Sequence, residues 1–159
     1  MSSDAIVLLK EDHRELLRLF RDYRTTPAKD TAARGELAGR IVHDVTVHTY
    51  LEDEVLFPRV RELLPQAHDE TVRHYQEHRN ADRLCEEITA LAPADPRFDP
   101  LVTALIDGLT RHIEEEEHDW FPRVRAAVSR KELQEIGTRL LAVRETAPRV
   151  PPTGPVSTA

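Results

Sequence analysis

The sequence predicts an all-α fold: an up-down-up-down four-helix bundle with a pseudo-two-fold repeat, followed by a short C-terminal helix. Three observations support this fold class. Apolar residues recur at intervals of three and four along four long segments, which is the spacing of a helix face. Prolines fall mostly between these segments, where they end helices. Aromatic residues make up only 5% of the chain, and its five glycines are too few for a β-sandwich with many tight turns.

The long segments define the four bundle helices. We expect these helices at residues 4–24, 31–64, 68–91 and 99–128. Pro58 lies inside the second segment and has no N–H for the helical hydrogen-bond pattern. It should therefore kink this helix, or end its main part near Phe57.

A short fifth helix should follow the bundle. Ser129 and Glu132 form a capping box, in which the serine side chain accepts a hydrogen bond from the first turn, and apolar residues at helical spacing come after it. Beyond this helix the chain is rich in proline and has little to bury. We therefore expect one domain at residues 1–145, the bundle with its fifth helix, and a flexible tail at residues 146–159.

Charge and composition exclude several classes of protein. The chain has 29 acidic and 22 basic residues, a net charge of -7, so it has no general attraction for nucleic acid or for an anionic membrane surface. No apolar run is long enough to span a membrane, and the N-terminus lacks the pattern of a signal peptide. A single cysteine, Cys85, excludes an internal disulfide and suits a reducing cytoplasm, where we expect the protein to reside.

The second and fourth segments contain an internal repeat. HTYLEDEVLFPRVR at residues 48–61 aligns without gaps on HIEEEEHDWFPRVR at residues 112–125. The first and third segments repeat more faintly, with DHRE at residues 12–15 against EHRN at residues 77–80. Two helical hairpins of similar plan, packed together, would form a bundle with pseudo-two-fold symmetry.

Histidines and glutamates lie on the inward faces of these helices. Residues four apart point the same way on a helix, and three such pairs continue the apolar stripes: His48 with Glu52, His74 with His78, and His112 with Glu116. A lone inward histidine is usually a hydrogen-bonded core residue, and a lone His-x-x-x-Glu is usually a surface pair. Here every helix supplies at least one inward histidine, counting His13 in the first. Imidazole and carboxylate converging in a bundle core are typical of a transition-metal site.

With these motifs the sequence resembles the hemerythrin-like (HHE cation-binding) proteins, of the stand-alone bacterial type. The resemblance covers about residues 5–128 and rests on the DHRE and EHR histidines and on two His-x-x-x-Glu motifs, each followed by Phe-Pro. It implies a non-haem centre of two iron ions with an oxo or hydroxo bridge. One iron would be held by His13 and His48, the other by His78 and His112, and Glu52 and Glu116 would bridge the two.

Three details of this ligand set stay open. His74 matches the first histidine of a family His-x-x-x-His motif, and its counterpart in the repeat is Leu9, which cannot bind metal. With His74 bound, an open coordination position would remain near His13 and His48. Oxygen-carrying relatives place the last carboxylate five residues after its histidine, at Glu117, whereas the repeat favours Glu116. Tyr75 is a further candidate ligand, although an ordinary packed tyrosine is the simpler interpretation.

Two functions compete. In the first, the di-iron centre binds peroxide or nitric oxide and turns it over, as a catalase-like or peroxidase-like oxidoreductase; the resemblance to stand-alone members favours this one. In the second, the protein binds or senses dioxygen, nitric oxide or iron without turnover. A bundle that uses its metal only for stability is a third, weaker alternative. The sequence does not distinguish iron from manganese or zinc, and it leaves the oligomeric state open, a monomer included.

Overall fold

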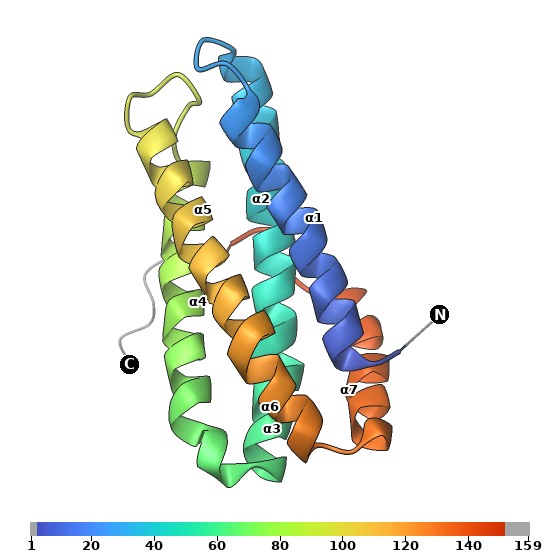
Figure 1. Cartoon of the computed structure of the whole chain (residues 1–159). Coiled ribbons are helices and arrows are strands. Elements are labelled where there is room, and N and C mark those ends of the chain that lie inside the picture. The colour runs from blue at the N-terminus through green and yellow to red at the C-terminus, as the bar shows by residue number, and fades with distance from the viewer. Residues whose placement is uncertain (1–2, 152–159) are drawn as a thin grey trace, which may run out of the picture.

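Helices form at each of the predicted segments, and four long rods pack side by side in the computed structural model, which describes residues 3–151 (Figure 1). The helices are α1 (Ala5–Thr25), α2 (Thr31–Leu51), α3 (Phe57–Leu63), α4 (His68–Thr89), α5 (Phe98–Glu115), α6 (Phe121–Ala127) and α7 (Arg130–Arg144). The predicted all-α bundle is confirmed. Within residues 3–151, no helix combines the length and the apolar character needed to cross a membrane.

Side-chain caps fix where three of the helices begin. The Asp4 carboxylate accepts hydrogen bonds from the first turn of α1, and Asp30 does the same for α2. Ser129 caps α7 by accepting from the Glu132 backbone N–H at 3.1 Å, as the capping box predicts. The Glu132 carboxylate accepts hydrogen bonds from Arg59 at 3.0 and 3.1 Å and so ties α7 to α3.

Two wide turns interrupt the second rod, formed by α2 and α3, and the fourth rod, formed by α5 and α6, at equivalent places. A π-helical turn, Glu52–Leu56, joins α2 to α3, and a second, Glu116–Trp120, joins α5 to α6. The backbone N–H of Phe57 reaches back five residues, and the residue after it is Pro58, which has no N–H to donate. The α-helical part of the second rod therefore ends earlier than predicted, at Leu51, and the rod continues past the proline instead of stopping there.

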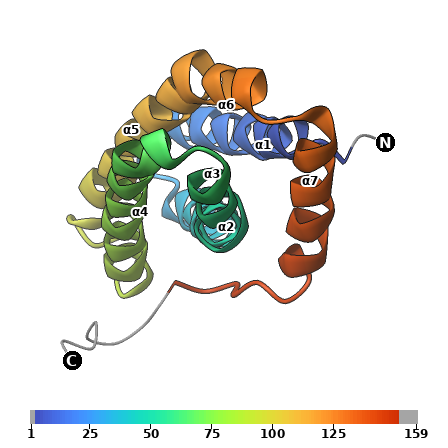
Figure 2. The ribbon, with the colours of Figure 1, turned by 90° about the horizontal axis from the view of Figure 1, so that it is seen from below.

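The rods form two helical hairpins. The first consists of α1 and α2, the second of α4 and α5, and α2 also packs against α4 to close the bundle. In the view along the bundle, α7 lies beside α1 on the side away from α4 (Figure 2). The fifth helix thus covers the first hairpin only.

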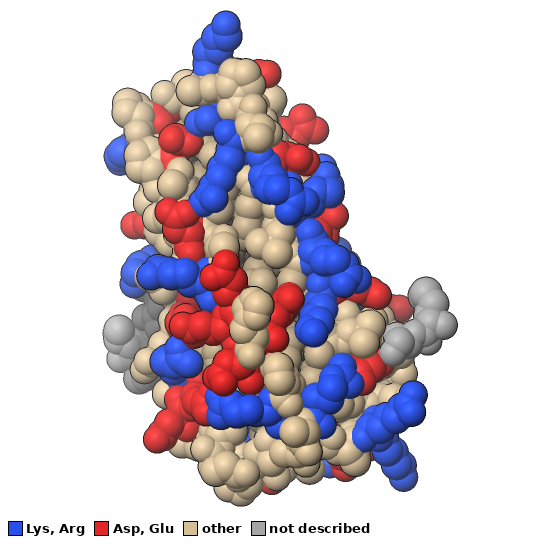
Figure 3. Space-filling model, viewed as in Figure 1, with Lys and Arg blue, Asp and Glu red and all other residues tan. Residues whose placement is uncertain are grey.

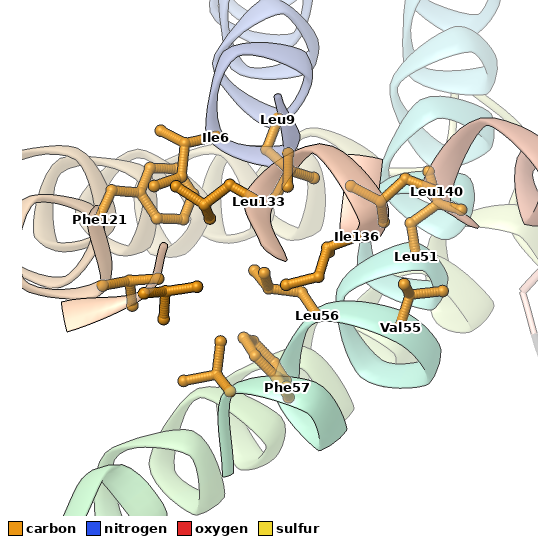
Figure 4. Close-up of a cluster of buried hydrophobic side chains, with 14 of the residues drawn as sticks. Ile6, Leu9, Leu51, Val55, Leu56, Phe57, Phe121, Leu133, Ile136 and Leu140 are labelled. Atoms are coloured by element: carbon orange, nitrogen blue, oxygen red, sulfur yellow. The ribbon is translucent and has the colours of Figure 1, made fainter. Parts of the chain in front are cut away.

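Two clusters of buried apolar side chains lie along the bundle, and the inward polar residues separate them. One cluster, towards the α3, α6 and α7 end, packs α7 onto the first hairpin (Figure 4). Its labelled members are Ile6, Leu9, Leu51, Val55, Leu56, Phe57, Phe121, Leu133, Ile136 and Leu140. The other cluster fills the opposite end and includes Leu16, Phe20, Ile41, Val45 and Leu105. On α1, His13 lies between Leu9 of one cluster and Leu16 of the other. The layer of inward polar residues is therefore bounded by apolar side chains at both ends.

The segment after α7 turns back across the bundle. Ala147 is buried in the α7 cluster, and Arg149 places a guanidinium nitrogen 3.5 Å from the His43 ring. Val150 and Pro151 line a shallow hollow with residues of α2. The predicted flexible tail comprises residues 146–159, and its residues 152–159 lie outside the described part of the chain.

Gly137 on α7 is expected to be essential for docking of the N-terminal segment. A Cβ atom at Gly137 would lie 1.4 Å from the Ser3 carbonyl oxygen, which is a backbone clash. Gly137→Ala should therefore lower the free energy of unfolding by about 1–3 kcal/mol. Gly39→Ala is the matched control, because nothing lies within 4 Å of the added methyl group. It should raise stability by about 0.5–1 kcal/mol. Thermal unfolding of both variants checks this, and equal stabilisation by the two would contradict the close approach.

Candidate metal centre

Five histidines and two glutamates come together in the middle of the bundle. All seven are buried, and Glu52 and Glu116 have no exposed surface at all. The rods contribute His13 from α1, His48 from α2, His74 and His78 from α4, His112 from α5, and the glutamates from the first residues of the two π-helical turns. The structure therefore brings all seven predicted residues into one cluster.

The first half of the cluster is built on the first hairpin. The Nε2 atoms of His13 and His48 lie 3.2 Å apart. His48 Nε2 lies 3.3 Å from Glu52 Oε1, and His13 Nε2 lies 3.3 Å from Glu116 Oε1. Two imidazoles and two carboxylates thus converge here.

The second half repeats this arrangement on the second hairpin. The Nε2 atoms of His78 and His112 lie 3.1 Å apart. His112 Nε2 lies 3.2 Å from Glu116 Oε1, and His78 Nε2 lies 3.3 Å from Glu52 Oε1. Each glutamate therefore contacts one histidine of each half, so the two carboxylates connect the halves.

The glutamate oxygens lack the hydrogen bonds that buried oxygens need. Both carboxylate oxygens of Glu52 and both of Glu116 are buried without a hydrogen-bond partner. A buried carboxylate without a partner costs several kcal/mol, and a cation removes that cost. Three groups of ligand atoms, each lying within 4.8 Å of one another, could hold a metal ion. They are His13, His48 and Glu116; Glu52, His78 and His112; and His74, His112 and Glu116.

The electrostatics also favour a cation. Burial lowers the pKa of His48, but the carboxylates of Glu52 and Asp12 outweigh it and raise this pKa to about 10. Burial likewise opposes protonation of His112, yet Glu116 raises its pKa well above the usual value. Without metal, protons on these imidazoles supply the positive charge, so a metal ion must displace them when it binds.

His74 differs from the other four histidines. Burial dominates and lowers its pKa, which keeps the imidazole neutral. Its Nδ1 lies 3.4 Å from His112 Nδ1, while its Nε2 is buried without a partner. The neighbouring Trp120, whose ring centroid is 5.2 Å away, also has an unpaired indole nitrogen. A neutral imidazole with a free nitrogen is the form that binds metal.

Carboxylates contact the outer ring nitrogens of two histidines, one in each half. His13 Nδ1 donates to Glu117 Oε2 at 2.6 Å, and His78 Nδ1 donates to Asp53 Oδ1 at 2.7 Å. Such contacts fix the tautomer and the ring orientation, so that Nε2 points inward. Glu117 therefore lies on the outer side of His13, whereas the Glu116 carboxylate faces the centre of the cluster.

The other two histidines have carboxylate neighbours as well. His48 Nδ1 donates to Asp12 Oδ2 at 3.1 Å. The equivalent contact, between His112 Nδ1 and Glu77 Oε1, is looser at 3.6 Å, and His74 Nδ1 lies at the same distance from that oxygen. The carboxylates thus follow the repeat: an acidic residue precedes His13 and His78.

Sequence analysis missed the roles of Asp12 and Asp53. The signal was present, because an acidic residue also follows Glu52 and Glu116, at positions 53 and 117. Each of these acids is adjacent in sequence to an inward residue. At such a position a helical pattern ordinarily predicts a solvated side chain.

The repeated Phe-Pro motif also has a role at the cluster. The His13 ring stacks on Phe121, with centroids 5.7 Å apart and an interplanar angle of 5°. The His78 ring stacks on Phe57, with centroids 5.3 Å apart and an angle of 27°. Each phenylalanine therefore packs against a histidine of the opposite hairpin and keeps water from that ring face.

Other candidates lie outside the cluster. His43 is partly exposed and contacts Asp44 at 2.9 Å. Tyr75 is 39% exposed on α4, with the Arg79 guanidinium 4.7 Å above its ring centroid. His43 is not among the residues grouped as possible metal ligands within residues 3–151.

Comparison with known proteins identifies the family. The model of the Hemerythrin HHE cation binding domain matches residues 4–124. The chain belongs to the hemerythrin HHE cation-binding family. This matched range contains all seven residues of the cluster and ends before α7. The HHE domain binds metal cations, and the buried His and Glu groups described above are able to hold them.

Individual relatives agree with this assignment. A protein of Nostoc sp. named DNA nickase is 30% identical over 137 residues, which are 86% of this chain and 38% of that protein. An uncharacterized hemerythrin-like protein of Schizosaccharomyces pombe is 25% identical over 82% of this chain and 62% of its own length. The chain thus spans less than two thirds of both relatives. The crystal structure of an HHE cation binding domain-containing protein from Mycobacterium kansasii has the same fold, with a TM-score of 0.70, 23% identity, and coverage of 90% of this chain and 86% of that one.

Metal ions are expected to stabilise the HHE domain against unfolding. A ligand that binds only the folded state at 100 times its Kd adds about 2.7 kcal/mol, so Fe²⁺ or Co²⁺ should raise the Tm of chelator-treated protein. Since bound protons must leave, the increase should be smaller at acid than at alkaline pH. His112→Ala should abolish most of the increase in Tm, because His112 belongs to two of the three groups of possible metal ligands. His43→Ala is the control and should retain it; an equal loss in both variants would exclude the cluster as the binding site.

Proposed function

We propose that this HHE domain holds two iron ions and turns over peroxide or nitric oxide. His13 and His48 would bind one ion, and His78 and His112 the other, with His74 as a further ligand. Glu52 and Glu116 would bridge them. The observation that carries this proposal is that each of these glutamates contacts one histidine of each half, while all four of their oxygens lack hydrogen-bond partners.

The residues of the chain would hold and protect such a centre. Two iron ions supply a Lewis acid and a reservoir of electrons. Glu117, Asp12 and Asp53 hold the Nδ1 protons of three ligand histidines and so keep each Nε2 available for metal. Phe57 and Phe121 cover two of the imidazole faces. The apolar clusters above and below limit the entry of water along the bundle axis.

A groove between α4 and α5 supports turnover rather than a purely structural metal. It has a volume of about 370 Å³ and is lined at its base by the buried His78 and His112. Its lining combines the small residues Ala81, Ala104 and Gly108 with leucines and with charged side chains such as Arg73, Glu77 and Arg111. A molecule of two to four atoms would therefore reach the second half of the cluster from solvent. The open coordination position that the family resemblance implies lies in the first half, next to the two glutamates that both halves share.

The name of the Nostoc relative does not establish the same activity for this chain. The chain spans only 38% of that protein, so its activity could belong to the remainder. A net charge of -7 opposes binding to phosphate backbones. On the face shown in Figure 3, acidic side chains gather near the middle and basic ones lie around them.

The iron content and the ultraviolet–visible spectrum of protein from iron-replete cells test the centre itself. We expect about two iron ions per chain, because each half offers two histidines and shares both glutamates, and charge-transfer bands in the near ultraviolet. Glu52→Gln should lower the iron content, because it removes the charge that connects the halves. A single colourless metal ion per chain would exclude the di-iron proposal.

Filling the groove tests turnover. Nothing lies within 4 Å of a Cβ atom at Gly108, so the side chain in Gly108→Leu would occupy the groove. We expect a kcat/KM for peroxide or nitric oxide at least about tenfold lower, equivalent to about 1.4 kcal/mol, with iron content unchanged. Oxygen evolution from peroxide and oxidation of a reductant are the measurements.

Gly39→Leu is the matched control for this experiment. Gly39 is also a mid-helix glycine with open space above it, but it lies on α2 at a different hollow. Its substitution should leave the rate unchanged. Equal rates in both variants would mean that the ligand enters elsewhere, and iron-loaded wild type without turnover would favour reversible binding of the same ligands.

A further inference from the structure

The helix that follows the matched HHE domain contacts Asp12, the carboxylate behind one histidine of the candidate metal centre. The family model ends at residue 124, and α7 begins at Arg130. We propose that Arg144 of α7 is a positioning residue, which acts through Asp12 to set the orientation of the His48 ring. This inference rests on the proposed function, since it takes His48 as a metal ligand.

The contacts form a continuous chain from α7 to the cluster. One guanidinium nitrogen of Arg144 donates to both carboxylate oxygens of Asp12, at 3.1 and 3.0 Å. Asp12 Oδ2 in turn accepts the Nδ1 proton of His48 at 3.1 Å. With Nδ1 held in this way, His48 Nε2 points at Glu52 Oε1, 3.3 Å away.

Asp12 needs two donors to stay in this position. Its side chain is 19% exposed, so most of the carboxylate has lost contact with water. Removing Arg144 would leave one oxygen without a partner, and turning that oxygen towards solvent would pull the other away from His48. The guanidinium therefore holds the carboxylate against the imidazole.

The second half of the cluster builds the same chain from within the HHE domain. His78 Nδ1 donates to Asp53 Oδ1 at 2.7 Å, and Arg79 donates to Asp53 Oδ2 at 2.6 Å. Arg79 directly follows the ligand histidine on α4. Its counterpart in the repeat is Arg14, which is exposed on α1. A His–Asp–Arg chain thus exists in both halves, on histidines that are not equivalent in the repeat, and in the first half its arginine comes from α7.

The position of α7 is well fixed, so Arg144 has a defined place to act from. Leu133, Ile136 and Leu140 bury against the first hairpin (Figure 4), and Glu132 pairs with Arg59 on α3. Because α7 packs on the first hairpin, loss of Arg144 should affect the His13–His48 half selectively.

Metal titration of the full chain tests the inference, with Co²⁺ or Fe²⁺ added to metal-free protein. In Arg144→Gln we expect one of the two ions to bind about 10- to 100-fold more weakly, as for other groups that orient a metal-binding histidine, and the second to bind as in wild type. Arg144→Lys retains the charge and should restore part of the affinity. Arg139→Gln, on an exposed face of the same helix, is the control and should match wild type.

A double-mutant cycle separates positioning from general stability. Since Arg144 acts through Asp12, Arg144→Gln should add little to the effect of Asp12→Asn. Independent effects on affinity, or normal binding of both ions by Arg144→Gln, would overturn the inference.

An NMR measurement does not depend on metal. The His48 Nδ1 proton, held by Asp12, should give a downfield resonance that exchanges slowly with solvent in wild type and in Arg144→Lys, and rapidly in Arg144→Gln. Unchanged slow exchange in Arg144→Gln would overturn the positioning role. Wild type that binds neither metal ion would instead refute the proposed function, while this resonance would still report on Arg144.

Discussion

Two carboxylates buried in the middle of a helical bundle are the constraint on which the rest of this structure depends. Glu52 and Glu116 have no exposed surface and no hydrogen-bond partner for any of their four oxygens. An apolar core cannot tolerate this without positive charge nearby. Four of the five inward histidines, all but His74, have raised pKa values, and with the carboxylates behind them they form a layer that can accept that charge. The apolar clusters on either side supply the burial energy that offsets the cost of the polar layer.

The two copies of the repeat build the same local structure around their glutamates. Each glutamate starts a π-helical turn, and each turn leads into a Phe-Pro pair. The proline cannot continue the α-helical hydrogen bonds, and the phenylalanine before it stacks on a histidine of the other hairpin. One short motif therefore places an inward carboxylate, widens the helix next to it and covers an imidazole. Wide turns of this kind are frequent at functional sites.

The bundle and its central residues could be predicted from the sequence because they depend on local rules. His48 and Glu52 lie four residues apart on an apolar face of the second rod. The repeat identifies Glu116 as the counterpart of Glu52 on the fourth rod. What could not be predicted depends on contacts between distant segments. Asp12 borders the inward face and reads as solvated, and its partner Arg144 lies on another helix. The end of α2 at Leu51 was also unexpected, since the proline signal lies at Pro58 and the wide turn before it has no signature in spacing.

The two halves share their ligand types but differ in what surrounds them, and these differences carry the functional argument. Leu9 and Leu56 of the first half are replaced by His74 and Trp120 in the second, which adds an imidazole with a free nitrogen. The groove from solvent also ends at the second half. Helix α7 packs on the first half, against α1 and α2. Two ions held by equivalent ligands would therefore have different surroundings, one with an additional histidine and a route to solvent, the other with a fixed, covered histidine pair. A ligand needs a route from solvent such as this groove, whereas a metal pair that serves only stability needs none.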